Sequence, residues 1–235
     1  MKRRDLLVGF TLASLRGQTP PQYSQSLYIP KTQLVEDRKF LHDFMDEFSF
    51  IDLVTAAPDV RITHIPVVLD RAGGAYGKIY GHISRQNPQS KLLDGEHSAV
   101  IVFRGPHSYI SPTWYVRSDV VPTWNFAVVH ASGRLRPIEE PKAFHDLLAR
   151  LIAKFENYEG STYDFMKLPE KYKYDLMKGI IGFEMEVEQL EGKFKLGQER
   201  REVDRAGVLK GLKSRKERSI GELTASFYER QRKIE

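Results

Sequence analysis

The segment Tyr80–Lys91 gathers more polar chemistry than a structural strand and turn require. Its hydroxyl, imidazole, guanidinium, amide and ammonium groups belong to His82, Ser84, Arg85, Asn87 and Lys91. A phosphate dianion is bound best by a guanidinium fork, an ammonium and a hydroxyl, which Arg85, Lys91 and Ser84 supply together. We expect a strand to end and a helix to begin here, so that these donors converge on one anion.

Three other segments combine polar and aromatic side chains. Thr63 and His64 interrupt the apolar strand sequence Ile62–Pro66, while Arg104–Tyr115 and Val121–Asn125 hold the two tryptophans of the chain. Flat aromatic walls beside anion donors suit a planar, phosphorylated ligand such as flavin mononucleotide (FMN). Histidines could alternatively form a metal cluster, but their spacing shows no metal-ligand pattern and favours hydrogen-bonded histidines. These histidines are His64, His82, His107 and His130.

The pattern of the remaining sequence predicts a mainly β protein with flanking helices. Short β-branched and aromatic segments, separated by Gly, Pro or Asp, are typical of an antiparallel barrel or sandwich. The expected strands are 50–56, 60–69, 78–83, 98–103, 120–135 and 180–190, with residues 70–77 as a hairpin connection. Apolar residues at helical spacing predict amphipathic helices over 35–48 and 143–156, and residues 199–235 favour a polar helix.

The composition of the chain excludes several kinds of functional site. The 235 residues include 36 Lys and Arg against 31 Asp and Glu, and no cysteine. Disulfides, thiolate metal sites and cysteine nucleophiles are therefore excluded. The densest basic run, Lys210–Arg218, is best explained as a solvated helix face or a disordered end, and it is the only segment whose charge would suit contact with nucleic acid. No sequence pattern of a DNA-recognition module is present. After the first fifteen residues we expect no contact with membrane, because no apolar run approaches the ~20 residues that span a bilayer.

The first residues have the sequence pattern of an export signal. Arg3 and Arg4 precede the moderately apolar segment Leu6–Leu15, which resembles a twin-arginine signal. We expect residues 1–18 to be this signal, 19–27 a linker, 28–211 the folded domain and 212–235 a basic helical or disordered tail. A periplasmic or exported protein is therefore the expectation, with a cytoplasmic protein as the alternative.

Five sequence strings, taken in one order, resemble the PaiB family of FMN-binding split-barrel proteins. This family is described as negative transcriptional regulators and is related in fold to pyridoxamine-phosphate oxidase. The resemblance extends from about Tyr28 to about Gly211. The strings are Thr-His-Ile-Pro, Gly-His-Ile-x-Arg-x-Asn-Pro-Gln, Gly-Pro-His-x-Tyr-Ile-Ser-Pro-x-Trp-Tyr, Val-Pro-Thr-Trp-Asn and Gly-Lys-Phe-Lys-Leu.

The resemblance implies a six-stranded antiparallel split barrel that forms a homodimer, with FMN bound between the subunits. Residues 63–68 would run along the isoalloxazine ring, and four residues of the 80–91 segment would hold the phosphate. The full set of expected cofactor-binding residues is Thr63, His64, Ile65, Pro66, His82, Ser84, Arg85, Asn87, Lys91, Trp114, Trp124 and Asn125. No metal ligand is expected.

Three functions remain open from the sequence. The first is an FMN-dependent oxidoreductase acting on a small redox substrate, in which the cofactor performs the redox step and the protein positions it. The second is a negative transcriptional regulator that senses a ligand. The third is a split barrel that binds haem through histidine.

Overall fold

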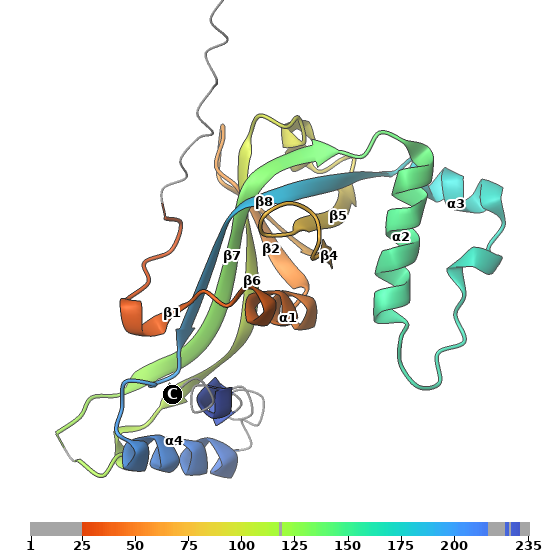
Figure 1. Cartoon of the computed structure of the whole chain (residues 1–235). Coiled ribbons are helices and arrows are strands. Elements are labelled where there is room, and N and C mark those ends of the chain that lie inside the picture. Colours follow the sequence, from red (N-terminus) through yellow and green to blue (C-terminus); the bar gives the residue numbers. More distant parts are fainter. Residues whose placement is uncertain (1–24, 118, 216–223, 226, 231–235) are drawn as a thin grey trace, which may run out of the picture.

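One antiparallel sheet forms the body of the computed structural model, which describes residues 25–117, 119–215, 224–225 and 227–230. The strands follow the order β3-β2-β6-β7-β8-β5-β4, and the short β1 also pairs with β8. Figure 1 shows that the sheet is strongly curled. The strands are β1 (Leu34–Val35), β2 (Phe50–Thr55), β3 (Arg61–Pro66), β4 (Val68–Asp70), β5 (Lys78–Ser84), β6 (Ser98–Ile110), β7 (Thr123–Pro137) and β8 (Ile180–Lys195).

The antiparallel split barrel is confirmed, but the expected number of six strands is wrong, because the structure has eight. One reason is that the expected strand 60–69 breaks at Val67, whose N–H donates to the carbonyl of Ser49 at 2.9 Å. β3 before the break pairs with β2, and β4 after it pairs with β5. The two ends of the strand order are therefore joined by one residue, so the sheet has to curl until its edges meet.

The barrel interior is filled by alternate residues of the strands and by one face of helix α1 (Arg38–Glu47). Leu41, Phe44 and Met45 of this helix are almost fully buried. Glycines in the sheet leave room for the side chains of this helix. A Cβ at Gly192 would lie 2.4 Å from Leu41, and one at Gly105 would lie 2.7 Å from Phe44. A larger residue at either position would push α1 out of the barrel.

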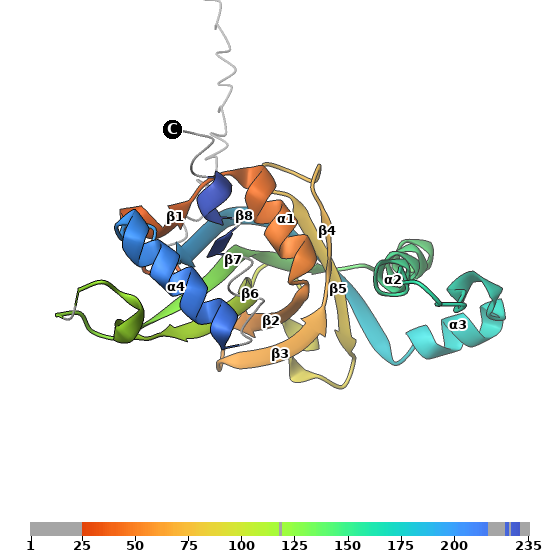
Figure 2. The same ribbon diagram turned by 90° about the horizontal axis from the view of Figure 1, so that it is seen from below.

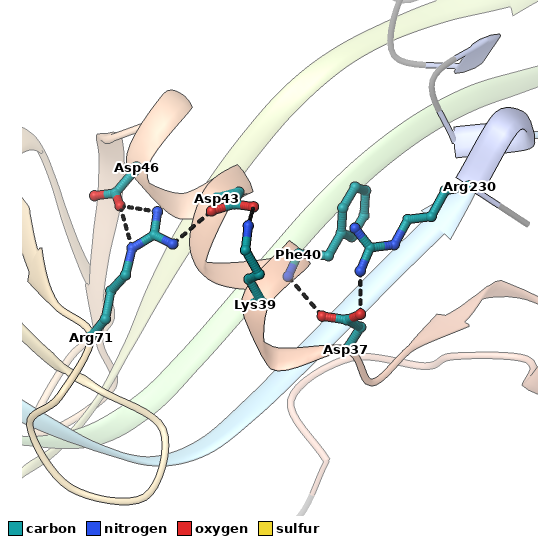
Figure 3. Close-up of polar contacts among 7 residues, drawn as sticks. All are labelled: Asp37, Lys39, Phe40, Asp43, Asp46, Arg71 and Arg230. Atoms are coloured by element: carbon teal, nitrogen blue, oxygen red, sulfur yellow. Dashed lines mark hydrogen bonds and ion pairs between the residues drawn. The ribbon is translucent and has the colours of Figure 1, made fainter. Parts of the chain in front are cut away.

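Charged contacts tie α1 to its neighbours, as Figure 3 shows. Arg71, between β4 and β5, donates to Asp43 at 2.6 Å and to Asp46 at 2.5 Å. At the start of the helix, Asp37 accepts the Phe40 N–H at 2.9 Å and also binds Arg230. The Phe40 N–H, with help from Arg230, holds the pKa of Asp37 below its usual range. These contacts fix both ends of the helix that fills the barrel.

Besides α1, the described residues form three further α-helices of eight or more residues, and residues 224–225 and 227–230 are also helical. Figure 1 shows that α2 (Pro141–Phe155) and α3 (Glu170–Met177) lie beyond the end of the sheet where β7 ends and β8 begins. Figure 2 shows α4 (Glu202–Ser214) on the same side of the sheet as α1. The predicted helix over 35–48 is thus present with shorter bounds, and the one over 143–156 begins two residues earlier and ends one residue earlier than predicted. Within the described residues, no helix has the length and apolar character needed to cross a membrane.

Both expected domain boundaries fall in segments that pack on the barrel. Ser26, in the expected linker, donates its hydroxyl to Glu191 at 2.7 Å. Leu212 is fully buried within α4, and Phe227 and Tyr228 are more than nine-tenths buried in the same core. The expected export signal (1–18), most of the linker and residues 216–218 of the basic run lie outside the described residues.

Helix α4 carries a glycine notch that receives the short 3-10 helix η3 (Pro112–Trp114). A Cβ at Gly211 would lie 2.2 Å from the Trp114 ring, and one at Gly207 would lie 2.0 Å from the Trp114 carbonyl oxygen. The two glycines therefore allow α4 to lie against the segment between β6 and β7.

We predict that Gly211→Ala destabilises the protein by about 1–3 kcal/mol, although alanine is the better helix former, because the added Cβ would overlap the Trp114 ring. Urea unfolding monitored by tryptophan fluorescence measures this change. Lys210→Ala, at an exposed neighbouring position, serves as the control. A stability gain in Gly211→Ala would show that the notch is not needed.

Candidate functional site

The turn that follows β5 is the centre of the expected anion site. β5 ends at Ser84, and the Arg85 N–H donates to the carbonyl of Gly179 at 3.0 Å. Asn87 then caps the 3-10 helix η2 (Pro88–Leu92), because its side chain accepts the Gln89 N–H at 2.9 Å. The expected helix is thus present only as a five-residue 3-10 helix, so any anion binding here has to come from side chains.

A buried amide, Gln89, holds this turn against the barrel. Its side chain is fully inaccessible, and its Oε1 accepts the hydroxyl of Thr63. Its Nε2 donates to the Leu53 carbonyl at 3.2 Å, to Thr55 Oγ1 at 3.1 Å and to the Arg61 carbonyl at 3.3 Å. One side chain therefore joins the turn to both β2 and β3.

Thr63 and Asn87 complete this network, which we call the Gln89 clasp. Asn87 Nδ2 donates to Thr63 Oγ1 at 2.8 Å, and the same hydroxyl donates to Gln89. The structure thus brings together two expected site residues, but it uses their polar atoms to fix the turn. Gln89 was not among the expected site residues, and its one signal in the sequence is its place in the Asn-Pro-Gln string.

The clasp leaves two cations unpaired on the turn. Arg85 and Lys91 are both exposed, and neither side chain has a hydrogen bond or ion pair to any other described residue. The hydroxyl of Ser84 accepts the Gln86 N–H at 3.2 Å, so its own O–H remains able to donate. Ser84 and Arg85 at the end of β5 and Lys91 of η2 therefore offer the hydroxyl, guanidinium and ammonium that a phosphate requires within eight consecutive residues.

His82 lies on β5 just before this turn, opposite Gly182 of β8. Its Nδ1 is buried and has no hydrogen-bond partner among the described residues. Burial lowers the pKa of His82, so the ring is neutral near pH 7. His82 can therefore contribute a hydrogen bond to a ligand but no positive charge.

The residues of β3 alternate between the two faces of the sheet. Ile65 points into the core and is 9% exposed, whereas His64 lies on the outer face. Pro66 is half-buried at the end of the strand. His64 Nδ1 lies 2.6 Å from Asp52 Oδ1, and Arg104 Nε lies 3.0 Å from Asp52 Oδ2. Because a carboxylate only accepts, Nδ1 of His64 carries a proton, and Nε2 has no hydrogen-bond partner among the described residues.

An open groove of about 620 Å³ continues from Arg104 across β6 and β7. Its walls include His107, Trp124 and Phe126, and Trp124 remains 53% exposed. We call this cavity the outer groove. It places the indole of Trp124 on the same sheet face as the polar group His64–Asp52–Arg104.

The other expected aromatic and amide residues lie elsewhere. Trp114 packs in the glycine notch of α4, and the guanidinium of Arg215 lies 5.2 Å from its ring centre. Asn125 is 2% exposed and faces the interior. Neither residue lines the outer groove. The described residues contain no group of three potential metal ligands.

Comparison with known proteins gives the family context of this geometry. A family model described as "Putative FMN-binding domain" matches residues 27–189. Protease synthase and sporulation protein PAI 2 of Bacillus subtilis is 33% identical over 189 residues, which cover 80% of this chain and 90% of that protein. An uncharacterized protein of Aspergillus fumigatus is 32% identical over 200 residues, covering 66% of this chain and 77% of its own.

Solved structures share the fold at much lower identity. The flavocytochrome Anf3 from Azotobacter vinelandii has a TM-score of 0.55 and 14% identity, covering 74% of this chain and 75% of its own. The FAD and heme binding protein from Mycobacterium smegmatis has a TM-score of 0.53 and 13% identity, covering 69% of this chain and 73% of its own. Both therefore show the architecture and leave the chemistry to the residues of this chain.

We predict that Gln89→Leu destabilises the protein by about 2–3 kcal/mol, because main-chain carbonyls of β2 and β3 lose their buried donor. The free energy of unfolding in urea measures the effect. Gln86→Leu, at an exposed position of the same turn, is the matched control. Equal stability of the two variants would show that the clasp does not hold the turn.

Proposed function

The chain belongs to the PaiB family of FMN-binding split-barrel proteins, and from this premise we propose that it is a flavin-dependent oxidoreductase whose turn after β5 binds the FMN phosphate. The match of residues 27–189 to the FMN-binding family model confirms the expected cofactor class. The oxidoreductase activity, the phosphate site and the dimer are our proposals.

The observation that carries the proposal is the pair of unpaired cations on a rigid turn. Surface Arg and Lys residues of this chain frequently pair with nearby carboxylates, as Arg71 does with two. Arg85 and Lys91 have no such partner among the described residues. Because the Gln89 clasp fixes the turn before a ligand arrives, little conformational entropy is lost when a phosphate is bound.

The outer face supplies groups suited to redox chemistry beside a bound flavin. The flavin, when bound, supplies the exchange of electrons or hydride. Asp52 holds the His64 ring through Nδ1, which leaves Nε2 to accept or return a proton. Arg104 keeps much of its guanidinium exposed, with 66% of the side chain accessible, and can attract an anionic substrate. Trp124 offers a flat apolar wall in the outer groove.

The absorbance spectrum of the purified protein separates the proposed function from its alternatives. Visible bands of an oxidised flavin support the proposal. A haem Soret band would replace it with the haem-binding alternative, which the name of the FAD and heme binding protein from Mycobacterium smegmatis suggests. A regulator that senses FMN would also be coloured. Bleaching of the flavin by a reductant, with reoxidation by an added acceptor, distinguishes catalysis from sensing.

We predict that Arg85→Ala weakens FMN binding by about tenfold to a hundredfold, because one charge-assisted phosphate contact contributes about 1.5–3 kcal/mol. Quenching of flavin fluorescence during titration of the apoprotein measures the dissociation constant. Lys213→Ala removes an exposed cation of α4 and controls for net charge. Equal affinities of both variants and the unchanged protein would place the phosphate elsewhere.

We also propose that the outer face joins two copies of this chain. Phe50 of β2 is 66% exposed, Ile62 of β3 is 55% exposed and Trp124 is 53% exposed, so the face holds more apolar surface than a monomer usually leaves in water. Asp52 and Arg104 add one charge of each sign on the same face. A two-fold contact pairs such a patch with itself and sets opposite charges against each other.

We predict that Ile62→Glu lowers the molecular mass in solution from dimer to monomer, because a two-fold contact would bury two unpaired carboxylates. Light scattering coupled to size-exclusion chromatography measures the mass. Leu176→Glu is the control, because Leu176 on α3 has the same 55% exposure. A dimer that survives Ile62→Glu but not Leu176→Glu would place the interface on α3 instead of the outer face.

A further inference from the structure

A second cavity lies at the split of the barrel, where β8 lacks a neighbour on one side. β5 pairs with residues 180–186 of β8, and β1 pairs with residues 192–193. Between them, residues 189–191 pair with β7 and with no other strand of the described residues. The resulting cavity has a volume of about 370 Å³ and is lined by Leu34, Leu41, Tyr76 and Glu191 among others. We call it the split pocket.

The split pocket contains a buried carboxylate without a counter-charge. Glu191 is 5% exposed, and its Oε2 accepts from Ser26 N at 3.1 Å and from Ser26 Oγ at 2.7 Å. Its Oε1 is buried and has no hydrogen-bond partner among the described residues. No described lysine or arginine forms an ion pair with it. A buried carboxylate in this state is costly unless a cation or strong donor joins it.

The neighbouring groups do not supply that charge. His130 lies opposite Glu191 in the sheet, and its Nδ1 is 2.9 Å from Ser26 Oγ. Burial lowers the pKa of His130, although the charge of Glu191 partly opposes the shift. The ring is therefore neutral near pH 7. Lys193 donates to the carbonyl of Tyr28 at 2.7 Å, and Arg38 donates to the carbonyl of Ala75 at 2.9 Å.

The remaining lining defines the chemistry of a ligand. Two carboxylates, Glu36 and Glu191, and one guanidinium, Arg38, line the split pocket. Arg38 is bound to the carbonyl of Ala75, and the excess of negative charge favours a cation over an anion. Leu34 and Leu41 offer apolar contact, and the ring of Tyr76 offers a face that attracts cations. A volume of this size lies within the range of small-molecule sites.

We infer that the split pocket binds a small aliphatic amine in its ammonium form. The ammonium donates to Oε1 of Glu191, and the alkyl chain packs on Leu34 and Leu41. None of these residues belongs to the turn after β5 or to the outer groove, so the inference does not depend on the proposed flavin function.

Isothermal titration calorimetry of the full-length protein with n-butylammonium chloride tests this inference. We expect saturable binding at one site per chain. n-Butanol, which has the same carbon chain and no charge, should bind at least about tenfold more weakly, because a charged hydrogen bond to a buried carboxylate is lost. No saturable heat with the amine, or equal binding of the alcohol, would overturn the inference.

Variants locate the binding site. Glu191→Gln keeps an acceptor for Ser26 but removes the charge, so it should weaken n-butylammonium binding at least about tenfold. Glu96→Gln changes an exposed glutamate and should bind as the unchanged protein does. Leu34→Trp places a larger side chain in the pocket and leaves Glu191 unsubstituted, so it should abolish n-butylammonium binding. This variant keeps the test valid if Glu191→Gln folds poorly. Unchanged affinity in Leu34→Trp would show that the amine binds elsewhere.

Discussion

The buried side chain of Gln89 is the constraint on which the candidate site depends. Its amide joins the turn after β5 to the main chain of β2 and β3, and Thr63 connects it to Asn87. The unpaired guanidinium of Arg85 and the unpaired ammonium of Lys91 are presented from a backbone that must keep its conformation for both to reach one anion. The clasp provides that backbone, because the turn cannot move without breaking hydrogen bonds that have no replacement from water.

Along the strands of the barrel, residues that stabilise the core alternate with residues that could bind a ligand. Inward residues pack against α1, whose charged ties to Arg71 and Arg230 hold it in place. Outward residues of the same strands form the polar group around Asp52 and the outer groove. Of the two tryptophans, only Trp124 lies on a strand, whereas Trp114 lies on η3. Trp114 lies in the glycine notch of α4, whereas Trp124 stays exposed in the groove.

Much of the architecture could be predicted from the sequence, because the two-residue and 3.6-residue periods report directly on burial. The break at Val67 could not, since the apolar pattern continues through it and only the pairing of β3 and β4 with different strands reveals it. The cations of the turn were predicted from their chemistry. The role of Gln89 could not be predicted, because the sequence does not distinguish a buried glutamine from an exposed one. Its hydrogen-bond partners are 26 to 36 residues away in the chain.

The central claim is that the turn after β5 recognises a phosphate. Parallel titrations of the apoprotein with FMN and with riboflavin, which differ only by that phosphate, test it most directly. We predict that FMN binds at least about tenfold more tightly than riboflavin and that added salt narrows the difference, because contacts between exposed charges are screened. Equal affinity for the two flavins, or no binding of either, would contradict the claim.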